Sequence, residues 1–165
     1  MYKKLIRAPL VFFLYNLLIA TNAFGAITID GLIDEPEWQD ATLFSDFVTV
    51  EPLTGGPAKY STQVLLIPSV EGIFVAFTNY QPPSVKRVKR QFPRDAQIEA
   101  DRNIVSIDFD GTALAGYDFT VGSANSMQDG IITPGSYSGD WDGTWYSQTS
   151  SGTDYWYSEI HIPWT

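Results

Sequence analysis

The stretch Ile29-Asp30-Gly31-Leu32-Ile33-Asp34-Glu35-Pro36-Glu37-Trp38 combines three local signals within ten residues. Asp30-Gly31 predicts a tight turn, because glycine adopts the positive φ that such a turn requires. Asp34 and Glu37 have the spacing of a capping box around Pro36, which predicts a short helical turn. Trp38 follows this turn as a large apolar anchor. Together they are typical of a lid on one end of a β-sandwich.

The first 25 residues have the pattern of a signal peptide. The pattern consists of a basic start, an apolar stretch and a small-x-small cleavage site: Lys3, Lys4 and Arg7, then residues 9–20, then Ala23-Phe24-Gly25. The apolar stretch is shorter than the roughly 20 residues of a transmembrane helix. We therefore expect removal of residues 1–25 and a periplasmic, outer-membrane-associated or secreted protein, with an uncleaved N-terminal anchor as the alternative.

The composition of the chain indicates a single acidic domain without disulfide bonds. The 165-residue chain carries a formal charge of −9, which becomes −12 once the three basic residues of the first 25, a segment without acidic residues, are removed. Such a charge disfavours binding to nucleic acid and to anionic lipid, unless the charge is segregated on the surface. The chain contains no cysteine, so a domain of residues 26–165 must depend on core packing or on bound ions for its stability.

Short β-rich runs punctuated by Gly, Pro and Asp follow along the chain, and they predict an all-β protein. Apolar and polar residues alternate in several of them, placing Val105, Ile107 and Phe109 on one face of their strand. The expected fold is an antiparallel β-sandwich, jelly-roll or immunoglobulin-like, with one short N-terminal helical turn. The connection from Tyr80 to Asp101 is long, and such loops are often functional.

Five segments in order resemble the family 9 carbohydrate-binding modules and their relatives. The segments are IDGLIDEPEW from Ile29, GIFVAFTNYQPPS from Gly72, RDAQIEADRNIVSIDFDG from Arg94, GYDFTVGSANSMQDG from Gly116, and WDGTWYSQTSSGTDYWYSEIHIPW from Trp141. The resemblance implies a sugar-binding sandwich, exported ahead of a hydrolase domain or an outer-membrane barrel. In that family further residues, including a last strand, follow the proline that matches Pro163, so the resemblance also implies a domain truncated at its C-terminal end.

Aromatic rings beside acidic and arginine side chains give the best candidate for a sugar site. Sugar C–H faces stack on indole or phenol rings, while sugar hydroxyls bind carboxylates and guanidinium groups. Trp141 and Trp145 are four residues apart, so in a regular strand they share a face, as either a two-ring platform or two core residues. The arginines have a structural alternative as well, an ion pair closing the long loop. The candidate residues are Trp141, Trp145, Asp140, Asp142, Arg94 and Arg102.

Carboxylates gather in two places, and oxygen ligands of this kind suit calcium. Family 9 modules can hold structural calcium, so the resemblance implies such a site here. The candidate ligands are Asp101, Asp108 and Asp110, and a second acidic group is Asp129, Asp140 and Asp142. No spacing typical of an EF-hand occurs, and a solvated acidic face remains the alternative.

One basic run, Lys86-Arg87-Val88-Lys89-Arg90, interrupts this acidic sequence. It predicts either contact with lipopolysaccharide, a membrane or an acidic glycan, or simply a solvated loop tip.

Catalytic motifs are missing from the sequence: there is no cysteine, no G-x-S-x-G segment, and a single histidine, His161. Three classes of function remain. The first is a non-catalytic carbohydrate-binding module acting beside a glycosidic-bond hydrolase. The second is a periplasmic N-terminal interaction domain of an outer-membrane protein. The third and weakest is a haem domain, for which processing leaves only His161 and Met127 as axial ligands.

Overall fold

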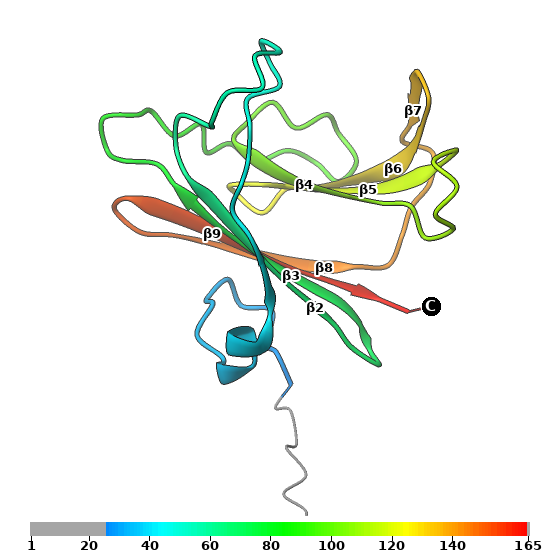
Figure 1. The fold of residues 1–165 in the computed structure, drawn as a ribbon, viewed down its shortest axis with the longest axis horizontal. Helices are drawn as coiled ribbons and strands as arrows, with labels where there is room; N and C mark the ends of the chain where they lie inside the picture. Colours follow the sequence, from blue (N-terminus) through cyan, green and yellow to red (C-terminus); the bar gives the residue numbers. More distant parts are fainter. Residues whose placement is uncertain (1–25, 165) are drawn as a thin grey trace, which may run out of the picture.

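The computed structural model describes residues 26–164, which form two stacked antiparallel sheets (Figure 1). One sheet has the strand order β1-β2-β3-β9-β8 and the other β4-β5-β6-β7. The elements are η1, a 3-10 helix (Pro36–Asp40), β1 (Thr42–Phe44), β2 (Thr62–Pro68), β3 (Gly72–Tyr80), β4 (Arg102–Ile107), β5 (Gly116–Gly122), β6 (Met127–Thr133), β7 (Ser136–Ser138), β8 (Tyr146–Ser151) and β9 (Tyr155–Pro163). The predicted β-sandwich is confirmed. The predicted signal peptide, residues 1–25, lies outside the described residues.

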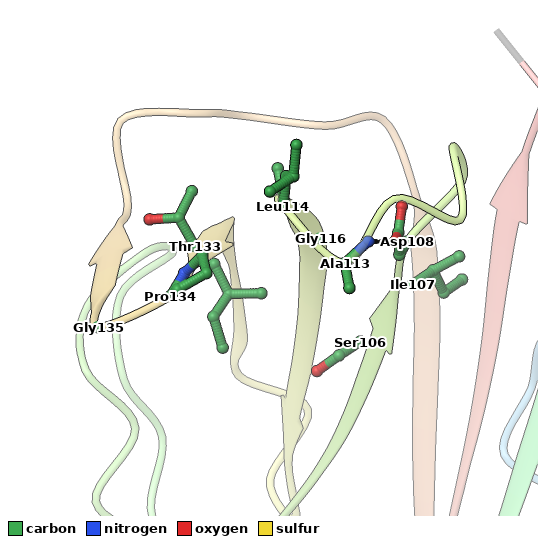
Figure 2. A pocket seen from close by; sticks show the side chains of 11 residues that line it. Ser106, Ile107, Asp108, Ala113, Leu114, Gly116, Thr133, Pro134 and Gly135 are labelled. Carbon is green, nitrogen blue, oxygen red and sulfur yellow. Dashed lines mark hydrogen bonds between the residues drawn. The ribbon is translucent and has the colours of Figure 1, made fainter.

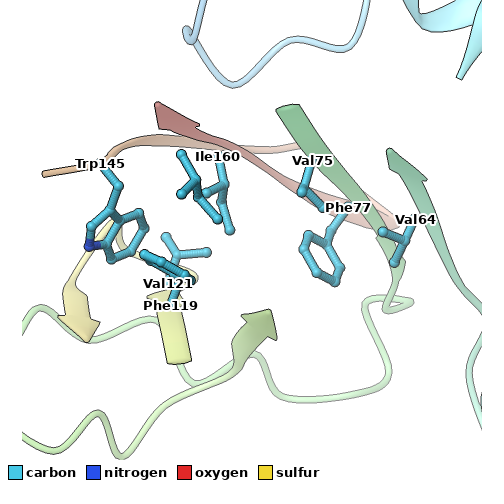
Figure 3. Packing of buried hydrophobic residues seen from close by; sticks show 8 residues of the cluster. Val64, Val75, Phe77, Phe119, Val121, Trp145 and Ile160 are labelled. Atoms are coloured by element: carbon cyan, nitrogen blue, oxygen red, sulfur yellow. The ribbon is translucent and has the colours of Figure 1, made fainter. Parts of the chain in front are cut away.

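The main core fills the space between the two sheets (Figure 3). On β3 and β9, Val75 lies opposite Ile160, and both side chains are almost completely buried. Phe119 and Val121 face them from β5, as the alternation of that strand predicts. The buried apolar members of the cluster are Val64, Val75, Phe77, Phe119, Val121, Trp145, Ile160 and Ile162.

Phe109 departs from the prediction that it shares a buried strand face with Val105 and Ile107. β4 ends at Ile107, and the following Asp108 carboxylate accepts hydrogen bonds from three backbone N–H groups, those of Asp110, Gly111 and Ala113. This turn takes Phe109 out of the core and leaves it 47% exposed.

The N-terminal segment covers the outer face of the five-stranded sheet (Figure 1, blue). Trp38 is buried, as predicted, but it packs on Phe74 and Ala76, which point away from the core between the sheets. The segment is therefore a cover on one sheet face, and the prediction of a lid on one end of the sandwich is wrong. The five-stranded sheet is consequently buried on both faces along part of β3.

The capping-box prediction for Asp34 and Glu37 is also wrong. The residue before the helix is Glu35, and no side chain caps the backbone there. The Glu35 carboxylate instead accepts hydrogen bonds from the Trp38 indole N–H at 3.2 Å and from the Thr28 N–H at 2.8 Å. The turn at Gly31 is confirmed by its φ of +88°, and a Cβ at this position would lie 2.9 Å from the Thr149 backbone.

Antiparallel pairing places the loops at two opposite ends of the sandwich. One end holds the segment before β2, the turn from β8 to β9, and the long connection from β3 to β4, which spans residues 81–101 as predicted. The other end holds the exits of β4 and β9 and the segment that enters β8. Within residues 26–164, no helix is long and apolar enough to cross a membrane.

Candidate functional site

A groove of about 540 Å³ lies at the end of the sandwich where β4 and β9 finish. Both sheets contribute to its walls, because its lining comes from β5, from the exits of β4 and β9, and from the segment before β8. The lining residues are Phe109, Asp110, Tyr117, Phe119, Trp141, Asp142, Gly143, Thr144, Pro163 and Trp164. Half of these side chains are aromatic, which makes the groove the most aromatic hollow described in the structure.

The aromatic rings of the groove meet at steep angles. The Trp141 ring centroid is 4.7 Å from that of Tyr117 and 5.8 Å from that of Phe119. Across the groove, the Phe109 and Trp164 rings are 6.3 Å apart at an interplanar angle of 75°. Since Phe109 and Trp164 are each about half exposed (47% and 51%), both offer ring surface to a ligand.

Trp164 is held in place by the turn between β2 and β3. Its indole N–H donates to the Ser69 carbonyl oxygen at 2.8 Å, and its backbone N–H donates to the Glu71 carbonyl oxygen at 3.2 Å. These bonds fix the ring although much of it is exposed. An ordered aromatic surface of this kind loses little conformational freedom when a ligand binds.

Polar groups surround the rings. The Asp142 carboxylate is 78% exposed, and Asp110 and Thr144 are also exposed along the lining. Carboxylate and hydroxyl oxygens of this kind can accept hydrogen bonds from a neutral polar ligand. The groove can therefore hold a molecule that combines apolar faces with hydroxyl groups.

Arg94, from the 81–101 loop, fixes the wall that carries Trp141. Its Nη2 donates to Asp129 Oδ1 at 2.8 Å, to Asp142 Oδ1 at 3.1 Å and to the Gly143 carbonyl oxygen at 3.1 Å. The Gly143 N–H in turn donates to Asp129 Oδ2 at 2.6 Å. Both backbone groups of Gly143 are thus held by the Arg94–Asp129 pair.

Asp129 belongs to the second predicted acidic group, and its side chain is completely buried. Burial raises the pKa of its carboxyl, an effect reinforced by Asp95, while the Gly143 N–H and the Arg94 guanidinium act in the opposite direction. Carboxylate oxygens of Asp95, Asp129 and Asp142 lie within 4.8 Å of one another. The Arg94 guanidinium bonds all three carboxylates and so supplies the positive charge at this cluster.

The predicted site residues do not all meet at the groove. Trp145 is only 3% exposed and packs edge-on against Phe119, so it belongs to the core and presents no free ring face. Asp140 is exposed but turns back to bond Ser138 Oγ at 3.1 Å. Arg102 starts β4 at the opposite end and donates to the Ile98 carbonyl oxygen. Of the predicted set, Trp141 and Asp142 line the groove, and Arg94 supports it.

The predicted calcium ligands Asp101, Asp108 and Asp110 cannot share one ion. Asp101 and Asp108 flank opposite ends of β4, and the seven residue steps between them span roughly 23 Å in an extended strand. Asp101 Oδ2 instead accepts from the Val88 N–H at 2.8 Å and from the Gln81 amide at 3.0 Å. Both aspartates organise loops.

The haem alternative finds no shared site either. His161 stacks on Phe74 on the outer face of the five-stranded sheet, with ring centroids 4.1 Å apart. Met127 belongs to β6 of the other sheet, where it packs against the core between the sheets. The two side chains therefore lie on different faces of different sheets.

Sequence reasoning missed Phe109, Tyr117 and Trp164 as groove residues. Phe109 and Trp164 share a signal that could have identified them. Phe109 follows Asp108, the first residue after β4, and Trp164 follows Pro163, the last residue of β9. Tyr117 begins β5 beside Trp141, and nothing in its local sequence distinguishes it from a core residue.

A second hollow, of about 460 Å³, lies between the loop after β4 and the Pro134–Gly135 turn (Figure 2). Small or aliphatic side chains, such as Ala113 and Leu114, dominate its walls. The Asp108 carboxylate beside it is occupied by the Ala113 N–H at 2.6 Å, drawn as a dashed line in Figure 2. This second hollow offers few polar groups to orient a ligand, so the aromatic groove is the better candidate for a binding site.

Comparison with known proteins gives matches to solved structures. A carbohydrate-binding module family 9 protein from Caldicellulosiruptor kristjanssonii in complex with cellotriose matches with a TM-score of 0.60 and 15% identity, over 85% of this chain and 64% of that one. The same kind of module in complex with glucose matches with a TM-score of 0.60 and 14% identity, over 86% and 66% of the two chains. No family model and no curated protein matches the sequence. The chain thus has the fold of these modules and spans about two thirds of their length.

Proposed function

We propose that this domain, built on the fold of the family 9 carbohydrate-binding modules, is itself a non-catalytic carbohydrate-binding module that holds its sugar in the aromatic groove. The observation that carries the proposal is the pairing of exposed rings with solvent-exposed carboxylates in one groove on that fold. The solved modules bind cellotriose and glucose, which supports a neutral sugar or the end of a polysaccharide chain as the ligand class.

Each wall of the groove has a role in this proposal. Trp141 and Trp164 stack on the C–H faces of a sugar ring, and Phe109 closes the outer side. Asp142 and Asp110 accept hydrogen bonds from sugar hydroxyls. Arg94 acts through Gly143 and Asp142 as a positioning residue, because its guanidinium holds the segment that carries Trp141.

The test is a glycan array followed by titration calorimetry on the best ligand, with and without calcium. Trp164→Ala should weaken binding at least tenfold while changing the melting temperature by a few degrees at most, because the ring is half exposed. Trp141→Ala should weaken binding with a moderate loss of stability. Tyr155→Ala, an exposed aromatic change on β9 outside the groove, is the matched control and should bind like the unchanged protein.

Trp145→Ala separates stability from binding. Because Trp145 is buried, its loss should lower the melting temperature by about 10 °C or more in a domain of this size. Absence of binding to any glycan on a broad array, or equal loss of affinity in the Tyr155→Ala control, would remove the groove proposal. The interaction-domain alternative would then take its place.

The setting of the module is part of the same proposal. The basic, apolar and small-residue pattern of residues 1–25 supports export to the periplasm, the outer membrane or the medium, beside a partner domain that hydrolyses glycosidic bonds. Intact-mass measurement of protein from the cell envelope should give Ala26 as the first residue. A mature protein that retains Lys3 would contradict export by this route.

A further inference from the structure

A finger of residues 45–59 projects between β1 and β2, at the end of the sandwich opposite the groove (Figure 1, teal, top). It is closed by its own backbone hydrogen bonds. The Thr49 N–H donates to the Gly56 carbonyl oxygen at 2.8 Å, and the Ala58 N–H donates to that of Phe47 at 3.1 Å. The finger is therefore a defined hairpin.

Large apolar side chains of the finger face solvent, interspersed with the exposed carboxylates of Asp46 and Glu51. Leu53 is 85% exposed and Val50 69% exposed at its tip, and Val48 and Phe47 are 52% and 41% exposed behind them. Contiguous exposed apolar side chains mark surfaces that contact another protein or a membrane. They lie outside any hydrophobic core cluster of the described residues, so folding of this domain gives no reason for them.

The base of the finger joins the base of the basic loop. The Tyr80 N–H donates to the Ser61 carbonyl oxygen at 2.9 Å, and the Tyr60 and Tyr80 rings are 6.4 Å apart. The 81–101 loop that follows Tyr80 carries five of the seven basic residues found after residue 25, against three acidic ones. The domain as a whole is strongly acidic, so its positive charge is concentrated at this end.

Most of these cations have no acidic partner among the described residues. Every ion pair in the described part of the chain involves Arg94. Arg87 bonds the carbonyl oxygens of Gln81 and Gly152. The other three cations of this loop, Lys86, Lys89 and Arg90, have no acidic partner among residues 26–164, and all three are exposed.

We propose that this end of the domain docks on an anionic lipid surface. The apolar tip of the finger enters the interface, while Lys86, Lys89 and Arg90 bind the negatively charged headgroups. The positive charge at this end is complementary to an anionic lipid surface. Contact with a second copy of the chain is less favourable, because it would bring two strongly acidic domains together. Because the groove is at the opposite end of the sandwich, docking leaves it accessible.

The absence of cysteine allows a local test in the full chain. Leu53→Cys and Val70→Cys are each labelled with an environment-sensitive nitrobenzoxadiazole fluorophore. Val70 is the matched control, because it is 96% exposed but lies in the turn between β2 and β3, at the other end. Each labelled protein is mixed with vesicles of phosphatidylcholine alone, or with one third phosphatidylglycerol, at low and at high salt. The local probe separates finger insertion from binding through residues 1–25.

The expected result is a blue shift and a several-fold rise in emission at position 53 with anionic vesicles at low salt, and no change at position 70. Combining Leu53→Cys with Lys86→Gln, Lys89→Gln and Arg90→Gln should reduce the apparent affinity at least tenfold. A control of equal charge change, Gln39→Glu with Thr133→Glu and Ser136→Glu, should reduce it much less, because these exposed residues lie away from the finger.

Three results would overturn the proposal. The first is an unchanged signal at position 53, or an equal change at position 70. The second is binding that does not depend on anionic lipid or on the three basic residues. The third is a fluorescence change that depends on protein concentration without vesicles, which would assign the finger to contact between copies of the chain.

Discussion

Gly31 and Glu159 lie 128 residues apart, and the Gly31 N–H donates a 2.8 Å hydrogen bond to Glu159 Oε2. The Asp30 N–H donates to the same oxygen at 3.1 Å. Glu159 is completely buried, and its other oxygen has no partner among the described residues. Burial raises the pKa of Glu159 to about 7, and the carboxylates of Glu35 and Asp30 add to this effect against the two N–H groups. The first turn of the domain is thus bound to a carboxyl group that titrates near neutral pH.

This contact predicts a pH dependence of stability. The pKa of Glu159 is raised on folding from 4.5 to about 7, so the folded state holds its proton more tightly than the unfolded chain. The resulting stability is complete below pH 4.5 and is lost as the pH rises through 7, by on the order of 1–3 kcal/mol. Glu159→Gln keeps an acceptor for Gly31 without the charge and should flatten this decline.

Urea unfolding at several values between pH 4.5 and 8 measures the effect. The advantage of Glu159→Gln over the unchanged protein should grow with pH. Glu99→Gln, a change at an exposed carboxyl in the 81–101 loop, is the control and should leave the decline in place. Parallel curves for all three proteins would contradict a role for Glu159.

Trp38→Ala should lower the free energy of unfolding by about 3–5 kcal/mol, because it empties a buried aromatic site against Phe74 and Ala76. Phe44→Ala removes an aromatic ring that is 49% exposed on β1 and should cost much less. Chemical denaturation of both variants measures the difference. A loss below about 1 kcal/mol for Trp38→Ala would show that the N-terminal segment contributes little to stability.

Gly143→Ala should displace the Trp141 ring, because the added Cβ would lie 2.4 Å from that ring. The expected cost is about 1–3 kcal/mol of stability, and a groove ligand should bind more weakly. Gly139→Ala is a matched control four residues earlier, since a Cβ there meets only an ordinary contact with Tyr137 at 3.7 Å. Tryptophan fluorescence and denaturation should change for Gly143→Ala and remain nearly constant for Gly139→Ala.

Arg94→Met should destabilise the domain by about 3–5 kcal/mol at pH 7, because it leaves the buried Asp129 carboxylate without its cation. The loss should shrink at acidic pH, where Asp129 becomes neutral. Adding Asp129→Asn should restore much of the stability at pH 7, since an amide oxygen can still accept from the Gly143 N–H. A double variant no more stable than Arg94→Met would contradict this explanation.

Strand faces were predictable because alternation depends only on neighbouring residues. Ile160 and Ile162 on β9 point into the core as their pattern indicates. The same alternation places Glu159 on the opposite face of β9, and yet it is buried. The alternation of a strand shows which face a residue occupies, but another segment of the chain decides whether that face meets solvent.

The site was less predictable for the same reason. Trp141 and Trp145 are near neighbours in sequence, and the structure puts one in the groove and the other in the core. The hydrogen bonds that join Gly143 to Arg94 and Asp129 fix the segment between the two tryptophans. Arg94 and Asp129 are themselves 35 residues apart in sequence. The residues themselves carry no local mark of this pairing.

The cover on the five-stranded sheet has a consequence for the order of events during synthesis. The segment around Gly31 and Trp38 is made before any strand, but part of its binding surface belongs to β9, which is made after all the others. β9 also completes its own pairing with β3, about 90 residues earlier at Gly72 and Pro163. Contacts of such long range form slowly. A growing chain therefore cannot finish this sheet before β9 has been made, and the segment made first cannot complete its docking until the strand made last has paired.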